Sequence, residues 1–198
     1  EVLADTVMLH AGFTGNGDDL VGTVAVVHVC IKDADARGGT AFQQHPRRYW
    51  NDPEATAASF IGGWTRTGDL GYVDEDGDLI MAGRSKELII RGGYNITPLE
   101  IETALHLHPS VQQAAVVGVP HEVLGDDVAA AVTLRPGTSA TPEDIIAFCR
   151  QHLADNKVPR TLLILDTMPL NPNGKILKKE LAPLLEQAAK EARVKRVA

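Results

Sequence analysis

The spacing of hydrophobic residues separates a front part of the chain with strand-like patterning from a rear part that alternates strands and helices. In the front part, apolar and β-branched residues over 21–31 predict a strand. Residues 70–73 and 78–81 flank an Asp-Glu-Asp-Gly turn at 74–77, which predicts a hairpin. An Asp-Pro-Glu sequence predicts a short helix over 52–60, because Asp caps a helix and Pro fits its first turn.

The rear part begins with a predicted strand at 88–90 and a turn at 91–93. A Thr-Pro-Leu-Glu sequence at 97–100 predicts a capping box, followed by a helix to about His106. Three further strands are predicted at 111–119, 128–134 and 162–165.

A second helix is predicted from the Thr-Pro-Glu-Asp sequence at 141–144 to about Leu153, and a turn at 171–174 precedes a last helix at 179–192. The apolar side of the second helix consists of Ile145, Ile146, Phe148, Cys149 and Leu153. This order of elements predicts an α+β fold, in which helices pack on a short sheet.

Charge supports a division of the chain. Residues 1–83 carry five basic and thirteen acidic side chains, a net charge of −8, whereas residues 84–198 carry a net charge of +1. We therefore expect two domains, 1–83 and 84–198, of which the first is β-rich and the second a complete α+β domain.

Composition excludes several classes of protein. The longest run of strictly apolar residues, 128–132, has five residues, whereas a membrane-spanning helix needs about 20. The net charge of −7 argues against a nucleic-acid partner. Two cysteines, Cys30 and Cys149, do not make a disulfide scaffold, and no basic residue precedes Lys32 to start a secretory signal, so we expect a cytoplasmic protein. The start at Glu1 suggests processing or a fragment.

Three features carry candidate chemistry, although each alone has a simpler interpretation. Asp69 follows Gly68 and is placed to accept ribose hydroxyls, or merely serves a turn. Lys175 lies beside a turn in the most basic region and is suited to neutralise a phosphate or carboxylate, or is a surface lysine. Gly92 and Gly93 allow a narrow ligand to approach the backbone, or form a turn.

No metal site is expected in this chain. The acidic run that starts at Asp74 has Leu79 and Ser85 where a calcium loop requires Gly and Glu. His106 and His108 lack further ligands at suitable spacing.

Taken together and in order, the motifs resemble the acyl-CoA synthetases of the adenylate-forming family. The matching sequences are GWTRTGDLG at 63–71, GRSKELIIRGGYNI at 83–96, PLEIE at 98–102 and PNGKIL at 172–177, with AAVVGVP at 114–120 and KVP at 157–159. The resemblance extends over residues 49–182.

The resemblance implies a two-step reaction. A carboxylic acid attacks the α-phosphate of ATP to give acyl-AMP, and coenzyme A then displaces AMP to give a thioester. By position, Asp69 binds the ribose hydroxyls, Arg84 contacts the ribose and phosphate, and Lys175 is the catalytic lysine of adenylation. Lys86 matches the hinge about which the small domain rotates, and Gly92 with Gly93 lines the channel for the pantetheine arm of coenzyme A.

The chain also departs from the family. Asn156 stands where many relatives carry an aromatic residue, and residues 1–48 match poorly. The phosphate loop and the glutamate that binds Mg²⁺ belong to the large N-terminal domain of the family, which is missing here. We therefore expect residues 1–83 to be the end of that large domain, and the chain to be inactive alone.

Two alternatives stay open. The chain is also compatible with a free-standing, non-catalytic module that binds a nucleotide or a partner protein. Within the enzymes, an adenylation domain that loads a carrier protein is the other candidate, although such domains usually have Asp at the hinge, so that Lys86 favours coenzyme A. The acid is open among fatty, aromatic and dicarboxylic acids, because the family builds the acid pocket from the large domain.

Overall fold

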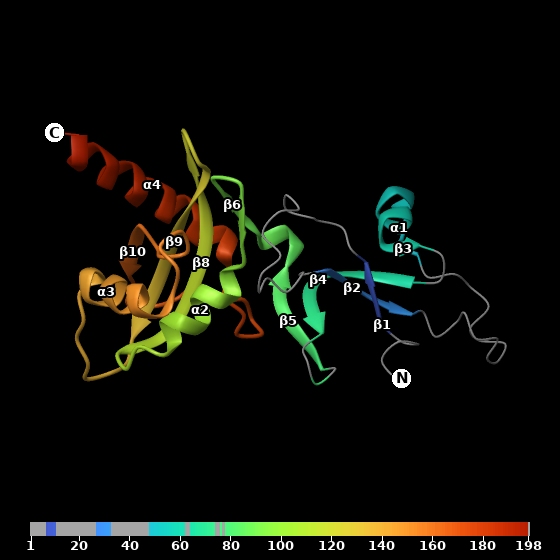
Figure 1. Cartoon of the computed structure of the whole chain (residues 1–198), viewed down its shortest axis with the longest axis horizontal. Coiled ribbons are helices and arrows are strands. Elements are labelled where there is room, and N and C mark those ends of the chain that lie inside the picture. Colours follow the sequence, from blue (N-terminus) through green and yellow to red (C-terminus); the bar gives the residue numbers. More distant parts are fainter. Residues whose placement is uncertain are drawn as a thin grey trace. The chain divides into compact units, whose positions relative to one another are not determined.

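The chain divides into two compact units, Glu1–Lys86 and Glu87–Ala198 (Figure 1). The structure is a computed structural model that describes residues 7–10, 27–32, 48–61, 64–73, 76 and 78–197. The division falls inside a single 3₁₀ turn, η3 (Ser85–Glu87), whereas the charge pattern placed the domain boundary between residues 83 and 84. The two units are described separately below.

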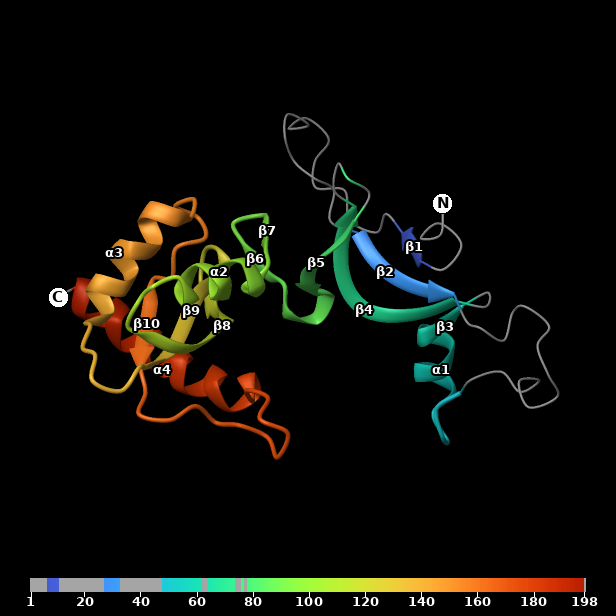
Figure 2. The same cartoon turned by 90° about the horizontal axis from the view of Figure 1, so that it is seen from below.

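The first unit contains an antiparallel sheet built around one long strand. The strand order is β1-β2-β4-β3, and β5 also pairs with β4, which runs beside β2 in Figure 2. The strands are β1 (Val7–His10), β2 (Val27–Lys32), β3 (Phe60–Ile61), β4 (Trp64–Val73) and β5 (Leu79–Arg84). The predicted hairpin is confirmed by the pairing of β4 with β5. Of the strand predicted at 21–31, residues 21–26 lie outside the described residues.

The short helix α1 (Pro53–Ser59) is confirmed together with its cap. The Asp52 carboxylate accepts a hydrogen bond of 2.8 Å from the Ala55 amide, which is one of the amides that a helix start leaves without an intrahelical partner.

The second unit contains a second sheet in the order β10-β9-β6-β7, with β8 paired to β9. The strands are β6 (Ile89–Arg91), β7 (Tyr94–Ile96), β8 (Val111–His121), β9 (Gly125–Leu134) and β10 (Thr161–Ile164). The helices are α2 (Pro98–His106), α3 (Pro142–His152) and α4 (Lys178–Val197). Only β10 pairs in parallel with its neighbour among these strands.

Helices cover both faces of this sheet, and Figure 2 shows α3 and α4 on opposite sides of β8 and β9. One face of β9 presents Val128, Ala130 and Val132 to a core that includes residues of α2 and α3. The other face presents Ala129 and Ala131 to α4. Burial on both faces explains why β9 is a continuous apolar run rather than an alternating one. The predicted α+β fold, with helices packed on a short sheet, is confirmed.

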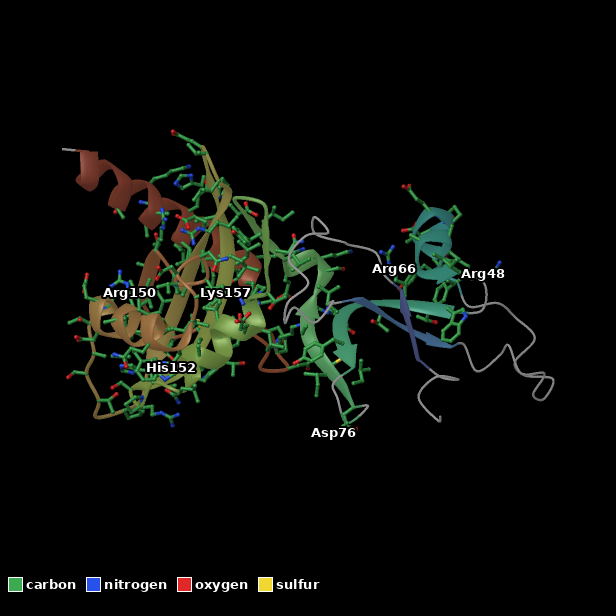
Figure 3. The ribbon with its side chains drawn as sticks, in the orientation of Figure 1. Arg48, Arg66, Asp76, Arg150, His152 and Lys157 are labelled. Carbon is green, nitrogen blue, oxygen red and sulfur yellow. The ribbon has the colours of Figure 1, made fainter. Side chains whose placement is uncertain are left out.

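The capping box predicted for α2 is wrong. The Thr97 side chain makes no capping hydrogen bond, and the Glu100 carboxylate instead binds the ammonium group of Lys157 at 2.7 and 2.9 Å. Lys157 is labelled in Figure 3. The Lys157 ammonium group gives charge-assisted bonds to both Glu100 oxygens, whereas a capping box would offer the carboxylate one backbone amide. The helix start predicted at 141–144 is confirmed, and a capping box is found there, because Thr141 and Asp144 make both reciprocal bonds.

Candidate functional site

The two residues expected to bind nucleotide lie opposite each other on neighbouring strands of the first unit. Asp69 of β4 is the cross-strand partner of Arg84, the last residue of β5. The Arg84 Nε atom donates to Asp69 Oδ1 at 2.8 Å, and the Arg84 and Asp69 side chains are 51% and 28% exposed, respectively. The strand register therefore presents a carboxylate and a guanidinium together, with part of each exposed to solvent.

Asp69 follows Thr67 and Gly68 inside strand β4, so the turn expected here from the sequence is wrong. The Thr67 hydroxyl accepts a hydrogen bond of 3.0 Å from the Asp69 amide, and the Ser85 hydroxyl donates to the Gly68 carbonyl at 3.1 Å. Gly68 has a φ of +80°, which an L-residue adopts at a cost. The Asp69 amide is thus bonded to Thr67, whereas the Asp69 carboxylate is bonded to Arg84.

Gly92 and Gly93 form the two-residue turn between β6 and β7. Their φ angles are +57° and +86°, as a turn with two left-handed positions requires. The Gly92 amide donates to the Leu124 carbonyl at 2.8 Å, so this turn is fastened to the turn between β8 and β9. A Cβ atom on Gly92 would lie 3.5 Å from the Leu124 side chain, whereas one on Gly93 would have nothing within 4 Å. Gly93 therefore borders open space.

A buried ion pair supports the glycine turn from inside. Arg91 Nε lies 3.0 Å from Asp127 Oδ1, and the two side chains are only 6% and 7% exposed. The Arg91 guanidinium also donates to the backbone carbonyl of Asn156. The pKa of Arg91 lies below its usual value, because the effect of burial outweighs the opposing effect of the Asp127 charge. The sequence pattern did not predict this pair, because it shows only one charge at the end of β6 and another near the start of β9.

Lys175 lies in a tight loop that a side chain holds closed. Asn171 Oδ1 accepts hydrogen bonds from the amides of Asn173, at 3.0 Å, and of Lys175, at 2.8 Å. The Asn171 amide in turn donates to the Lys175 carbonyl at 2.8 Å, and Gly174 has a φ of +77°. The predicted turn is confirmed. The Lys175 side chain is exposed on a backbone that is fixed at both its amide and its carbonyl.

The predicted site residues fall into separate groups. Asp69 and Arg84 form one pair in the first unit, and Lys86, in η3, is the exposed last residue of that unit. The glycine turn and the Lys175 loop belong to the second unit.

Among the described residues, no three His, Cys, Asp or Glu side chains gather as a metal site would require. His108, which sequence analysis weighed as a ligand, accepts from the Ser110 amide at 3.2 Å and packs edge-on against Phe148. Within the described part of the chain, no helix has the length and apolar character needed to cross a membrane.

Comparison with known proteins identifies the fold. Residues 100–175 match the family of AMP-binding enzyme C-terminal domains. An oxalate–CoA ligase of Arabidopsis thaliana is 44% identical over 78% of this chain and 28% of its own length. A long-chain fatty acid–CoA ligase of Bacillus subtilis is 46% identical over 67% of this chain and 24% of its own length.

Among solved structures, the amide bond synthetase McbA of Marinactinospora thermotolerans superimposes with a TM-score of 0.71 at 36% identity. The match covers 89% of this chain and 34% of that chain. The chain therefore spans about a quarter to a third of the length of these relatives. It belongs to the adenylate-forming, AMP-binding enzyme family and corresponds to the C-terminal portion of its members.

Proposed function

We propose that this chain is the C-terminal portion of an ATP-dependent acyl-CoA ligase. The full-length enzyme would join a carboxylic acid to AMP with release of pyrophosphate, and coenzyme A would then displace AMP to form a thioester. The observation that carries the proposal is the rigid loop that presents Lys175 on the surface of a C-terminal domain of this family. The CoA ligases of Arabidopsis thaliana and Bacillus subtilis described above support the same reaction class.

Lys175 serves the adenylation step in this proposal. As the acid carboxylate attacks the α-phosphorus of ATP, negative charge moves from the carboxylate to the phosphate oxygens and the pyrophosphate leaves. An ammonium group placed between carboxylate and phosphate stabilises that charge in the transition state. Because the Lys175 amide and carbonyl are both fixed by Asn171, little backbone reorganisation is needed when the loop reaches the nucleotide.

Asp69 and Arg84 serve the nucleotide. An ionised carboxylate has about four acceptor positions, so Asp69 can hold Arg84 at one oxygen and still accept ribose hydroxyls. Arg84 orients that carboxylate and offers further donors to the α-phosphate.

The second step uses the glycine turn. We assign Lys86 as the hinge, a position supported by the division of the chain immediately after it. Rotation there would replace the Lys175 loop at the nucleotide by Gly92 and Gly93, and the open side of Gly93 suits the narrow pantetheine arm of coenzyme A.

The remaining parts of the enzyme would come from the large N-terminal domain, including the phosphate loop and the Mg²⁺ ligand. Without them we expect the isolated chain to be inactive. A cytoplasmic location suits Cys149, which is a free, buried thiol.

The acid and the acceptor are tested together in the full-length protein that contains this chain. The protein is incubated with ATP and a panel of fatty, aromatic and dicarboxylic acids, with and without coenzyme A, and products are identified by mass spectrometry. We expect acyl-AMP without coenzyme A and acyl-CoA with it. If the acyl-AMP reacted only with an added amine or carrier protein, coenzyme A would not be the acceptor. The absence of any acyl-AMP would favour the non-catalytic module.

A further inference from the structure

Lys178 is a largely buried lysine at the start of α4, three residues after Lys175. Its side chain is only 26% exposed. The position is unfavourable for a cation, because the first turn of a helix carries the positive end of the helix dipole. Something else must therefore stabilise its charge.

Two carboxylates from distant parts of the second unit surround the Lys178 ammonium group. Lys178 Nζ lies 2.6 Å from Glu87 Oε2 and 2.9 Å from Glu102 Oε1. Burial alone lowers the pKa of Lys178, but the hydrogen bonds and charges of Glu87 and Glu102 outweigh it, so the pKa lies above its usual value. The ammonium group is thus held charged by partners that are themselves half-buried.

Glu102 connects Lys178 to the core of the second unit. Glu102 lies on α2, and its Oε1 atom also accepts a hydrogen bond of 2.9 Å from the amide of Val116 in β8. Val116 is fully buried. One carboxylate oxygen therefore joins α2, β8 and the start of α4.

Glu87 connects Lys178 to the place where the second unit begins. It is the first residue of that unit and directly follows Lys86. Lys178 lies 91 residues further along the chain. The Lys178–Glu87 bond therefore connects the first residue of the second unit to α4, the helix that follows the Lys175 loop.

We propose that Lys178 is a positioning residue that sets where the hinge ends, by anchoring Glu87 to α2, β8 and α4. Glu87 and the Lys175 loop then move as one rigid body, and the change in backbone angles is confined to Lys86. This inference rests on the proposed function of Lys86 and Lys175. The bonds of Lys178 would transmit a rotation at the hinge to the Lys175 loop.

The anchor is tested in the 198-residue chain by backbone ¹⁵N relaxation. With the anchor, we expect order parameters for the amides of Glu87 and Leu88 near the rigid value of about 0.85, and in Lys178→Met we expect them below about 0.6. Lys178→Arg, which keeps the charge, should restore the rigid values. The matched control is Lys190→Met, since Lys190 lies on the same helix and pairs at 2.7 Å with Glu186, four residues away.

Unchanged order parameters in Lys178→Met, or an equal loss in Lys190→Met, would overturn the proposal. Should Lys178→Met fail to fold, Glu87→Ala removes the same link, leaves the bond from Lys178 to Glu102, and must loosen Leu88 in the same way.

In the full-length enzyme, Lys178→Met should slow both half-reactions about tenfold, with an unchanged KM for ATP and with rescue by Lys178→Arg. A loss of order at Glu87 and Leu88 without any effect on either half-reaction would refute the hinge assignment. Relaxation measures the anchor without any assumption about activity, so the two failures are distinguishable.

Discussion

Replacing Gly93 by leucine separates the two half-reactions in this account. Gly93 lies in the β6–β7 turn with a φ of +86°, and an added Cβ would meet nothing within 4 Å. The cost to stability is therefore backbone strain without a clash, about 1–2 kcal/mol for an L-residue in the left-handed region. Domains are stable by about 5–15 kcal/mol, so the variant should remain folded.

The same side chain should obstruct the pantetheine arm. We expect Gly93→Leu to slow thioester formation from preformed acyl-AMP at least a hundredfold, which corresponds to about 2.7 kcal/mol. Adenylation, measured by pyrophosphate exchange in the full-length enzyme, should keep its wild-type rate because the turn is not used in that step.

Gly137→Leu is the matched control for Gly93→Leu. Gly137 is also exposed, has a φ of +77°, and would place its Cβ in open space. It should therefore carry the same strain and leave both half-reactions unchanged. An equal loss of both half-reactions in Gly93→Leu, or the same selective loss in Gly137→Leu, would refute the assignment of the glycine turn to coenzyme A.

Other positions give further expected outcomes. Lys86→Pro should restrict the hinge and impair one half-reaction more than the other in stopped assays of each step, and unchanged rates in both would remove Lys86 from the mechanism. Asn171→Ala should slow pyrophosphate exchange about tenfold, because the Lys175 amide loses its acceptor, while Asn171→Asp keeps the acceptor and should largely restore the rate. Burial raises the pKa of the Cys149 thiol to about 11, so little thiolate forms at pH 8. Iodoacetamide should therefore leave Cys149 unmodified in the folded chain and alkylate it in urea, as read by mass spectrometry of the peptide that contains Cys149, whereas rapid alkylation of that peptide without urea would contradict the burial of Cys149.

Local sequence signals predicted the elements whose stabilising contacts are local. The helix start at Pro53 follows from Asp52, three residues before the amide that it caps, and the start of α3 follows from Thr141 and Asp144. The hairpin of β4 and β5 and the turn before Lys175 likewise follow from short turn sequences. In these cases the partners lie within a few residues, so that the pattern contains the whole interaction.

The sequence pattern did not predict all the contacts and strands that the structure shows. Glu100 was expected to cap α2, but it binds Lys157, 57 residues away. The strand β7 was missed for a different reason: it has only three residues, two of them exposed, so it shows no apolar pattern of its own.

The sequence predicted only those candidate site residues that belong to the recognised motifs. Resemblance identified the residues expected to touch substrate, whereas their supports depend on partners that only the fold brings together. The Arg91–Asp127 pair and the Lys178–Glu87 pair join residues far apart in sequence. Asn171 is closer to Lys175, but its role depends on the backbone path of the loop.

The most direct test of the account is pyrophosphate exchange in the full-length enzyme with Lys175→Ala. Removing one donor that stabilises transition-state charge costs about a hundredfold to a thousandfold in rate. We predict a loss of that size in exchange, with thioester formation from preformed acyl-AMP preserved, and wild-type behaviour for Lys179→Ala, an exposed lysine four residues further on. Wild-type exchange in Lys175→Ala would contradict the central claim that this loop delivers the catalytic lysine.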